Sequence, residues 1–172
     1  MSPRANNEGD ICLTCGLCCS GGLFDHVDLQ PGEIDPIVAL GAKLYPGEPP
    51  RIAFPCALLC GKACTVYDNR PAMCRKYRCE LLFRRENGGI SDSEALGLIK
   101  QALHLVAAVE ALLPEGQTVS DARRRLQDDP EFWRKETGAE QQRALRFVMT
   151  MAALSLHLDR HFRSEDQRLI QR

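Results

Sequence analysis

The chain has 172 residues, of which 44% are apolar and 26% are charged, and this composition is typical of a globular protein of one or two domains. Its 22 Lys and Arg residues nearly balance its 23 Asp and Glu residues, and the formal net charge is -1. A general binder of nucleic acids or membrane surfaces needs a large positive field, so we expect neither as a partner.

The first ten residues, MSPRANNEGD, contain no apolar segment, so we expect no secretory signal and a cytoplasmic location. The apolar runs at residues 102–113 and 145–158 are shorter than the ~20 residues that span a bilayer. We expect both runs to be core helices.

Four cysteines lie close together in the segment CLTCGLCC, as Cys12, Cys15, Cys18 and Cys19. A CxxC pair lets two thiolates reach one ion from a tight turn, so such pairs recur in zinc and iron–sulfur sites. Neighbouring side chains diverge, by about 100° on a helix, so Cys18 and Cys19 cannot easily share one tetrahedral ion. We expect them to serve different metal centres. In the alternative, one of the pair is a buried thiol with no ligand role.

The rest of the N-terminal region is predicted to contain few regular elements. We expect a short strand at residues 26–29, a helix of about two turns at 31–41, and a helix at 71–85 with Pro71 in its first turn. Short elements separated by many turns are typical of a module that metal organises in place of a large apolar core.

Five more cysteines follow the first group, namely Cys56, Cys60, Cys64, Cys74 and Cys79. Nine thiols in a reducing compartment do not suit a disulfide framework, and an odd count leaves one thiol unpaired in any case. We therefore expect metal or redox chemistry, in which the second group completes the centres that the first group begins.

Basic residues surround the last two cysteines: Arg70, Arg75, Lys76, Arg78, Arg84 and Arg85. We expect their charge to offset the thiolates, with a solvated helix face as the alternative, because RNA binding would need interleaved aromatic residues. His26, near the first cysteine group, and the pair His157 and His161 are interpreted as polar or packing residues rather than metal ligands.

The remaining chain is predicted to be helical. Ser91 and Glu94 have the spacing of a capping box that opens a helix to about Leu113; Ser120 or Asp121 starts a shorter helix to Leu126; and a long helix runs from Ala139 to about Phe162. The long helix has apolar residues at Leu145, Val148, Met149, Ala152 and Leu156.

These elements predict a mainly α protein in two parts. Residues 1–88 would form a small irregular cysteine-rich metal-binding module with short strands. Residues 89–172 would form an α-helical extension that packs on the module and through which a protein partner would bind.

The segments CLTCGLCC, PC and CTVYDNRPAMCRKYRC resemble the YkgJ-like cysteine-cluster family, whose CxxCxxCC domain is known as a zinc- or iron-chelating domain. The resemblance covers residues 12–79 and implies these metal ligands: Cys12, Cys15, Cys18, Cys19, Cys56, Cys64, Cys74 and Cys79. Cys60 is extra to the family pattern, so either Cys56 or Cys60 could be the ligand that lies between Cys19 and Cys64 in sequence.

An all-cysteine ligand set suits zinc and iron–sulfur clusters equally, and we favour an iron–sulfur cluster over zinc. The first hypothesis for function is a redox or cluster-carrying protein, and the second is a structural zinc module for protein interaction. Because the family resemblance extends to a flagellin lysine N-methylase, the third is an accessory or catalytic part of a protein methyl-transfer system. The sequence has no GxSxG or P-loop motif and assigns no catalytic or cofactor-binding residue.

Overall fold

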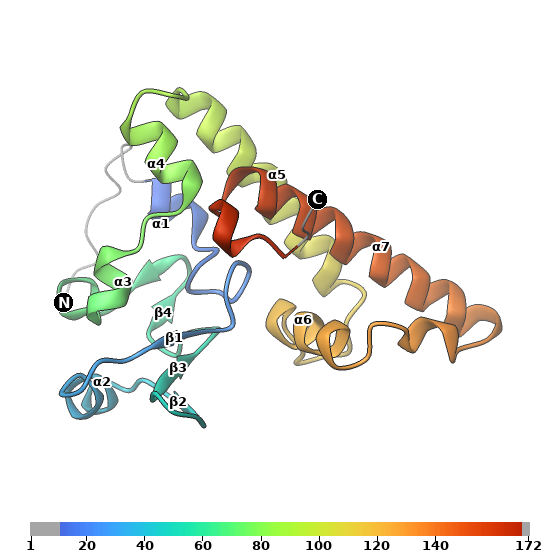
Figure 1. Ribbon diagram of the computed structural model, residues 1–172, viewed down its shortest axis with the longest axis horizontal. Helices are drawn as coiled ribbons and strands as arrows, with labels where there is room; N and C mark the ends of the chain where they lie inside the picture. The colour runs from blue at the N-terminus through green and yellow to red at the C-terminus, as the bar shows by residue number, and fades with distance from the viewer. Residues whose placement is uncertain (1–10, 170–172) are drawn as a thin grey trace. The chain divides into compact units, whose positions relative to one another are not determined.

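The computed structural model of the protein describes residues 11–169 (Figure 1). Of these residues, 53% are helical and 8% are in strands, which confirms a mainly α protein whose cysteine-rich N-terminal region contains short strands. Within residues 11–169, no helix has both the length and the apolar character needed to cross a bilayer. The expected absence of a secretory signal concerns residues 1–10, which lie outside the described residues.

The chain divides into two compact units between Arg78 and Cys79. The limits expected for the two parts, 1–88 and 89–172, and the packing of the second part on the first stay predictions.

The first unit combines short helices with two small sheets. Its helices are α1 (Ile11–Cys15), α2 (Ile34–Ala39) and α3 (Ala72–Lys76), with a 3-10 turn η1 (Tyr67–Asn69), and its strands are β1 (His26–Asp28), β2 (Leu44–Tyr45), β3 (Arg51–Ala53), β4 (Leu59–Cys60) and β5 (Ala63–Cys64). The strand predicted at residues 26–29 is β1 and the helix predicted at 31–41 is α2, so both predictions are confirmed.

The central strand of the first sheet is β3, which pairs antiparallel with β1 and β2. Val27 and Leu44 both lie opposite Ile52, which is buried. β4 and β5 form a separate antiparallel hairpin. The core that packs on the sheet consists of Leu29, Ile37, Ala42, Ile52 and Leu58. This core is small for a stable unit, so another source of stability is expected.

The single helix predicted at residues 71–85 is wrong, because the chain forms α3 and then α4 (Glu80–Glu86). Pro71 precedes α3 as its N-cap instead of lying in its first turn. Tyr77 and Cys79 adopt extended backbone conformations between the helices. The Sγ atom of Cys79 accepts a hydrogen bond from the amide of Leu82 at 3.4 Å, so this cysteine caps a new helix where the sequence shows no glycine or proline.

The second unit is built from helices: α4, α5 (Asp92–Glu110), α6 (Val119–Asp128) and α7 (Gly138–His161), with 3-10 turns η2 (Phe132–Arg134) and η3 (Glu165–Gln167). The predicted capping box at the start of α5 is present, since Ser91 and Glu94 exchange hydrogen bonds of 2.8 and 3.2 Å. The start of α6 was predicted too late. Thr118 caps it, because its amide donates to the Asp121 carboxylate at 2.8 Å and its hydroxyl accepts from the Asp121 amide at 3.3 Å.

The long helix α7 confirms the element predicted from Ala139 to Phe162 and packs beside α5 (Figure 1). Its buried face consists of Ala144, Phe147, Met151, Leu154 and Leu158. The apolar residues Leu145, Met149 and Leu156, which marked the helix in the sequence, are exposed. The helix therefore has two apolar sides, and its contacts with α5 and η2 select the buried one.

A buried ion pair ends α7. Nη1 of Arg163 donates to the carboxylate of Asp159 at 2.7 Å, and the two side chains are 2% and 7% exposed. The same carboxylate accepts hydrogen bonds from the amide of Leu169 at 3.2 and 3.1 Å. Asp159 thereby joins the end of the helix to the segment that follows it.

Replacing Asp159 by Ala should lower the free energy of unfolding of the second unit by about 3–5 kcal/mol, because it leaves the Arg163 charge buried without this partner. Urea unfolding followed by far-UV circular dichroism measures the loss. Glu131→Ala is the control, because its pair with Arg134 at 2.7 Å is exposed and should contribute less than about 1 kcal/mol. Equal, small losses in both variants would contradict this role of Asp159.

Candidate metal centre

The first cysteine group begins on α1. Cys12 and Cys15 have i, i+3 spacing, so both lie on one side of this short helix. Gly16 ends the helix with a φ of +67°, and its amide donates to the carbonyl of Cys12 at 3.0 Å. A Cβ atom at Gly16 would lie 3.3 Å from the Cβ of Lys62. Glycine therefore permits both the left-handed turn and the close approach of this loop to the β4–β5 hairpin.

Cys18 and Cys19 lie in the turns that follow α1, and both are half-buried. The carbonyl of Cys19 accepts a hydrogen bond from the amide of Cys56 at 2.8 Å. Cys56 also packs against the small core of the first unit. Two cysteines that are far apart in sequence are therefore neighbours in the fold.

The β4–β5 hairpin separates Cys60 from Cys64. Leu59 lies directly opposite Cys64, and Cys60 lies directly opposite Ala63. Directly paired residues share a face of a sheet, and successive residues alternate between faces, so Cys60 and Cys64 belong to opposite faces. Cys60 is exposed whereas Cys64 is half-buried. The hairpin thus turns Cys60 away from the face that carries Cys64.

Cys74 lies on α3, and Glu33 holds the start of that helix. The Glu33 carboxylate accepts hydrogen bonds from the amide of Ala72 at 2.7 Å and from the amide of Gln30 at 2.9 Å. One side chain thereby joins the loop before α2 to the first turn of α3, two residues before Cys74.

Four thiols from these segments, those of Cys19, Cys56, Cys64 and Cys74, lie within electrostatic reach of one another. Burial and then the three neighbouring thiols raise the pKa of Cys19 to about 12. Burial and then Cys56 and Cys64 raise the pKa of Cys74 to about 11. Burial also raises the pKa of Cys56, with a partial offset by the backbone at Leu58 and a further rise from Cys64. We call these four residues the thiol cluster.

Arg70 supplies positive charge beside the thiol cluster. Its charge acts against burial and lowers the pKa values of Cys19 and Cys74 from where burial alone would put them. The guanidinium lies 3.5 Å from the centre of the Tyr67 ring, and its Nε donates to the Tyr67 carbonyl at 2.8 Å. Of the six basic residues expected to offset the thiolates, Arg70 is the one whose charge lowers the pKa values of both Cys19 and Cys74.

All nine cysteines are thiols in the structure. Residues 11–169 contain no group of three or more His, Cys, Asp or Glu side chains already arranged as metal ligands. The electrostatic effect between thiols extends over several ångströms, whereas a Zn–S bond measures about 2.3 Å. The four thiols are thus neighbours whose side chains must turn toward a common point to bind an ion. As donors, they fit zinc and iron.

Cys79 lies at the start of the second unit as the N-cap of α4. Burial raises the pKa of its thiol, and hydrogen bonds from the backbone at Leu82 and Leu81 act in the opposite direction. The ligand role of Cys79, like that of the other cysteines in the set implied by the resemblance, stays a prediction.

The histidines have contacts within the fold. The ring of His26 stacks on Tyr45 with a centroid distance of 6.4 Å. The rings of His157 and His161 lie 4.9 Å apart, and Nε2 of His157 donates to the carbonyl of Leu98 at 3.0 Å. Burial and then the charge of His157 lower the pKa of His161, which favours its neutral form.

Sequence reasoning did not identify two residues that position the cysteines, Gly16 and Glu33. A glycine directly after a CxxC pair is a recognisable signal for a tight turn. Glu33 offers no comparable signal, because its partner Ala72 is 39 positions away in the sequence.

No curated protein and no solved structure matches this chain. A family model, CxxCxxCC, matches residues 11–95, and its description is "Putative zinc- or iron-chelating domain". The match spans both cysteine groups and supports zinc or iron chelation through cysteines. Residues 11–95 therefore belong to the CxxCxxCC family, as the YkgJ-like resemblance implied.

Proposed function

We propose that the thiol cluster is a four-thiolate metal centre that holds an iron–sulfur cluster and gives the protein a redox or cluster-carrying role. The observation that carries this proposal is that four half-buried thiols from separate segments of the first unit are neighbours, with the Cys56 amide bonded to the Cys19 carbonyl at 2.8 Å. Burial and neighbouring thiols raise the pKa values of Cys19, Cys56 and Cys74, and a bound cation would offset the charge of their thiolates. The half-buried thiols also leave the centre within reach of a redox or acceptor protein.

The remaining members of the proposed ligand set are Cys12, Cys15, Cys18 and Cys79. Their assignment rests on the family pattern and, for Cys12 and Cys15, on their shared side of α1. We propose that they serve separately from the thiol cluster, because Cys18 and its neighbour Cys19 diverge.

A structural zinc ion is the second candidate, and the small core of the first unit favours it. Five buried side chains, Leu29, Ile37, Ala42, Ile52 and Leu58, make up the cluster that packs on its sheet, and a tetrahedral Zn²⁺ would add stability to this unit. The same centre could then organise a surface for protein interaction. Nothing within residues 11–169 adds support for the methyl-transfer hypothesis.

Protein purified without oxygen should be brown and should contain iron and acid-labile sulfide, because thiolate-to-iron charge transfer absorbs visible light. Reduction should bleach the colour. Metal and sulfide analysis beside the visible spectrum provides the measurement. A colourless protein with stoichiometric zinc and no sulfide would instead establish the structural zinc module, since filled-shell Zn²⁺ has no such absorption.

Metal binding to the metal-free protein should strengthen as the pH rises. The pKa values of Cys19 and Cys74, raised to about 12 and 11, leave both thiols protonated at neutral pH, and a metal must displace those protons. Because two protons on these thiols compete with the metal, zinc binding should weaken about a hundredfold for each unit by which the pH falls. Competition titrations with a chromophoric chelator between about pH 6 and pH 8 measure this slope. A flat profile would contradict thiolate ligation here.

Cys19→Ser and Cys74→Ser should each lose the metal of the thiol cluster, because a hydroxyl is a poor replacement for a soft thiolate. Cys60→Ser is the matched control and should retain the metal, because the hairpin places Cys60 on the face opposite Cys64. Metal content per chain and the visible spectrum report the result. If Cys60→Ser strips the metal while Cys56→Ser keeps it, the roles of Cys56 and Cys60 must be exchanged.

A further inference from the structure

The outer side of α7 carries an apolar stripe that is not covered within the structure. Leu145, Met149, Ala152 and Leu156 follow one another at i, i+4, i+7 and i+11, the spacing of a seam that packs against another helix. Met149 is 72% exposed and Leu156 is 54% exposed. Together with Leu145 and Ala152, which are also exposed, they form what we call the outer stripe.

A groove of about 520 Å³ lies between α5 and α7. On α5 it is lined by Gly97, Lys100, Gln101, His104 and Leu105, and on α7 by His157. The α5 residues recur at i, i+3, i+4, i+7 and i+8, so they form one continuous side of that helix. A Cβ atom at Gly97 would meet no other atom within 4 Å, so the groove is open above this residue.

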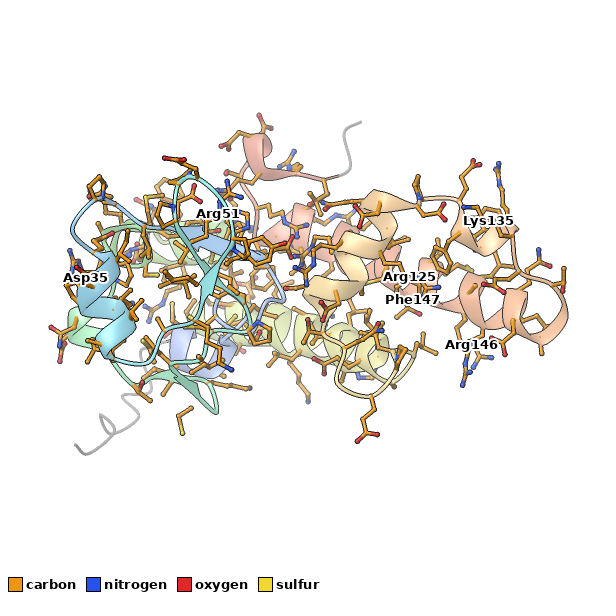
Figure 2. The ribbon with its side chains drawn as sticks, turned by 90° about the horizontal axis from the view of Figure 1, so that it is seen from below. Asp35, Arg51, Arg125, Lys135, Arg146 and Phe147 are labelled. Atoms are coloured by element: carbon orange, nitrogen blue, oxygen red, sulfur yellow. The ribbon has the colours of Figure 1, made fainter. Side chains whose placement is uncertain are left out.

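Positive charge separates the outer stripe from the groove. Arg146, Ala153, His157 and Arg160 recur at i, i+7, i+11 and i+14, so both arginines share a side of α7 with the groove residue His157. Both arginines are exposed. Figure 2 shows Arg146 extending away from α7, whereas Phe147 turns to the opposite, packed side. The outer stripe therefore has a basic border on the side that faces the groove.

Carboxylates are missing from the sequence of both helices along this surface. In α7, residues 141–158 contain no Asp or Glu, and Asp159 is buried with Arg163. In α5, residues 95–109 contain no Asp or Glu but do contain Lys100. A chain with a net charge of -1 thus concentrates positive charge along the border between the outer stripe and the groove. Complementarity requires an occupant with an apolar face and negative flanks.

We propose that the groove between α5 and α7, together with the outer stripe, docks an acidic amphipathic helix of a partner protein. A helix that binds in a groove presents apolar residues at i, i+3, i+4 and i+7. The apolar residues of the outer stripe repeat with the same helical period, so they can pack along such a helix. Met and Arg are enriched where proteins meet, and the flexible side chain of Met149 adapts readily to an incoming apolar residue. A second copy of α7 is disfavoured as occupant, because it would bring Arg146 and Arg160 toward like charges.

The test uses the full chain and two fluorescent peptides that are stapled as helices of about five turns. One peptide carries Leu on one face and Glu on both flanks, and the other carries Lys in place of every Glu. Fluorescence anisotropy should show that the Glu peptide binds at least about tenfold more tightly than the Lys peptide. Added salt should weaken the binding, because the Arg side chains are exposed to solvent.

Substitutions separate the apolar contribution from the charged one. Met149→Ser should weaken binding of the Glu peptide severalfold, whereas Val38→Ser, at an exposed apolar position on α2, should not. The double variant Arg146→Glu with Arg160→Glu should reverse the preference toward the Lys peptide. Arg134→Glu, at an exposed site on η2, is the control for charge reversal and should leave the preference unchanged. The thermal midpoint of every variant checks that the fold is intact.

Several outcomes would overturn the proposal. Equal binding of both peptides, or binding of neither, removes the acidic helix as occupant. A dimer in analytical ultracentrifugation that Met149→Ser dissociates assigns the surface to a second copy of the chain. Tighter binding to phosphatidylserine vesicles than to the Glu peptide assigns it to a lipid surface. None of these results depends on the metal content of the thiol cluster, so they leave the proposed metal function unaffected.

Discussion

The burial of neighbouring thiols from separate loops is the constraint on which the first unit depends. Ionising Cys19 or Cys74 is unfavourable because each is partly buried and lies beside other sulfur atoms, so their pKa values rise to about 12 and 11. A cation reverses this balance, since it attracts every thiolate at once. The small core of this unit supplies little other reason for bringing such loops together.

Short-range contacts hold the loops that carry these thiols. The hydrogen bond between the Cys56 amide and the Cys19 carbonyl joins two of the segments, and the Glu33 carboxylate holds the start of α3. Arg70 lies against Tyr67 and brings compensating charge. A site of this kind is organised by backbone hydrogen bonds and one fixed cation, and the side chains retain freedom to turn toward a ligand.

The second unit follows a different principle, because helix packing supplies its stability. The buried faces of α5 and α7 meet, and the Asp159–Arg163 pair joins the end of α7 to the chain that follows. The helices also keep an apolar and basic surface outside that contact. Under the two proposals, the first unit would bind the metal and the second unit would bind a partner protein. The division of the chain into two compact units is compatible with these separate roles.

The sequence by itself determined what depends on neighbours along the chain: the capping box of Ser91 and Glu94, the existence of α5 and α7, and the spacing of the cysteines. Helix capping and hydrophobic periodicity depend on residues a few positions apart, so both can be recognised in the sequence without a structure. Only the tertiary structure decided that Cys19 neighbours Cys56, Cys64 and Cys74, that Cys60 belongs to the other face of its hairpin, and which apolar side of α7 is buried. Each of these depends on partners distant in sequence, and several arrangements satisfy the same local preferences until long-range packing and strand register select one.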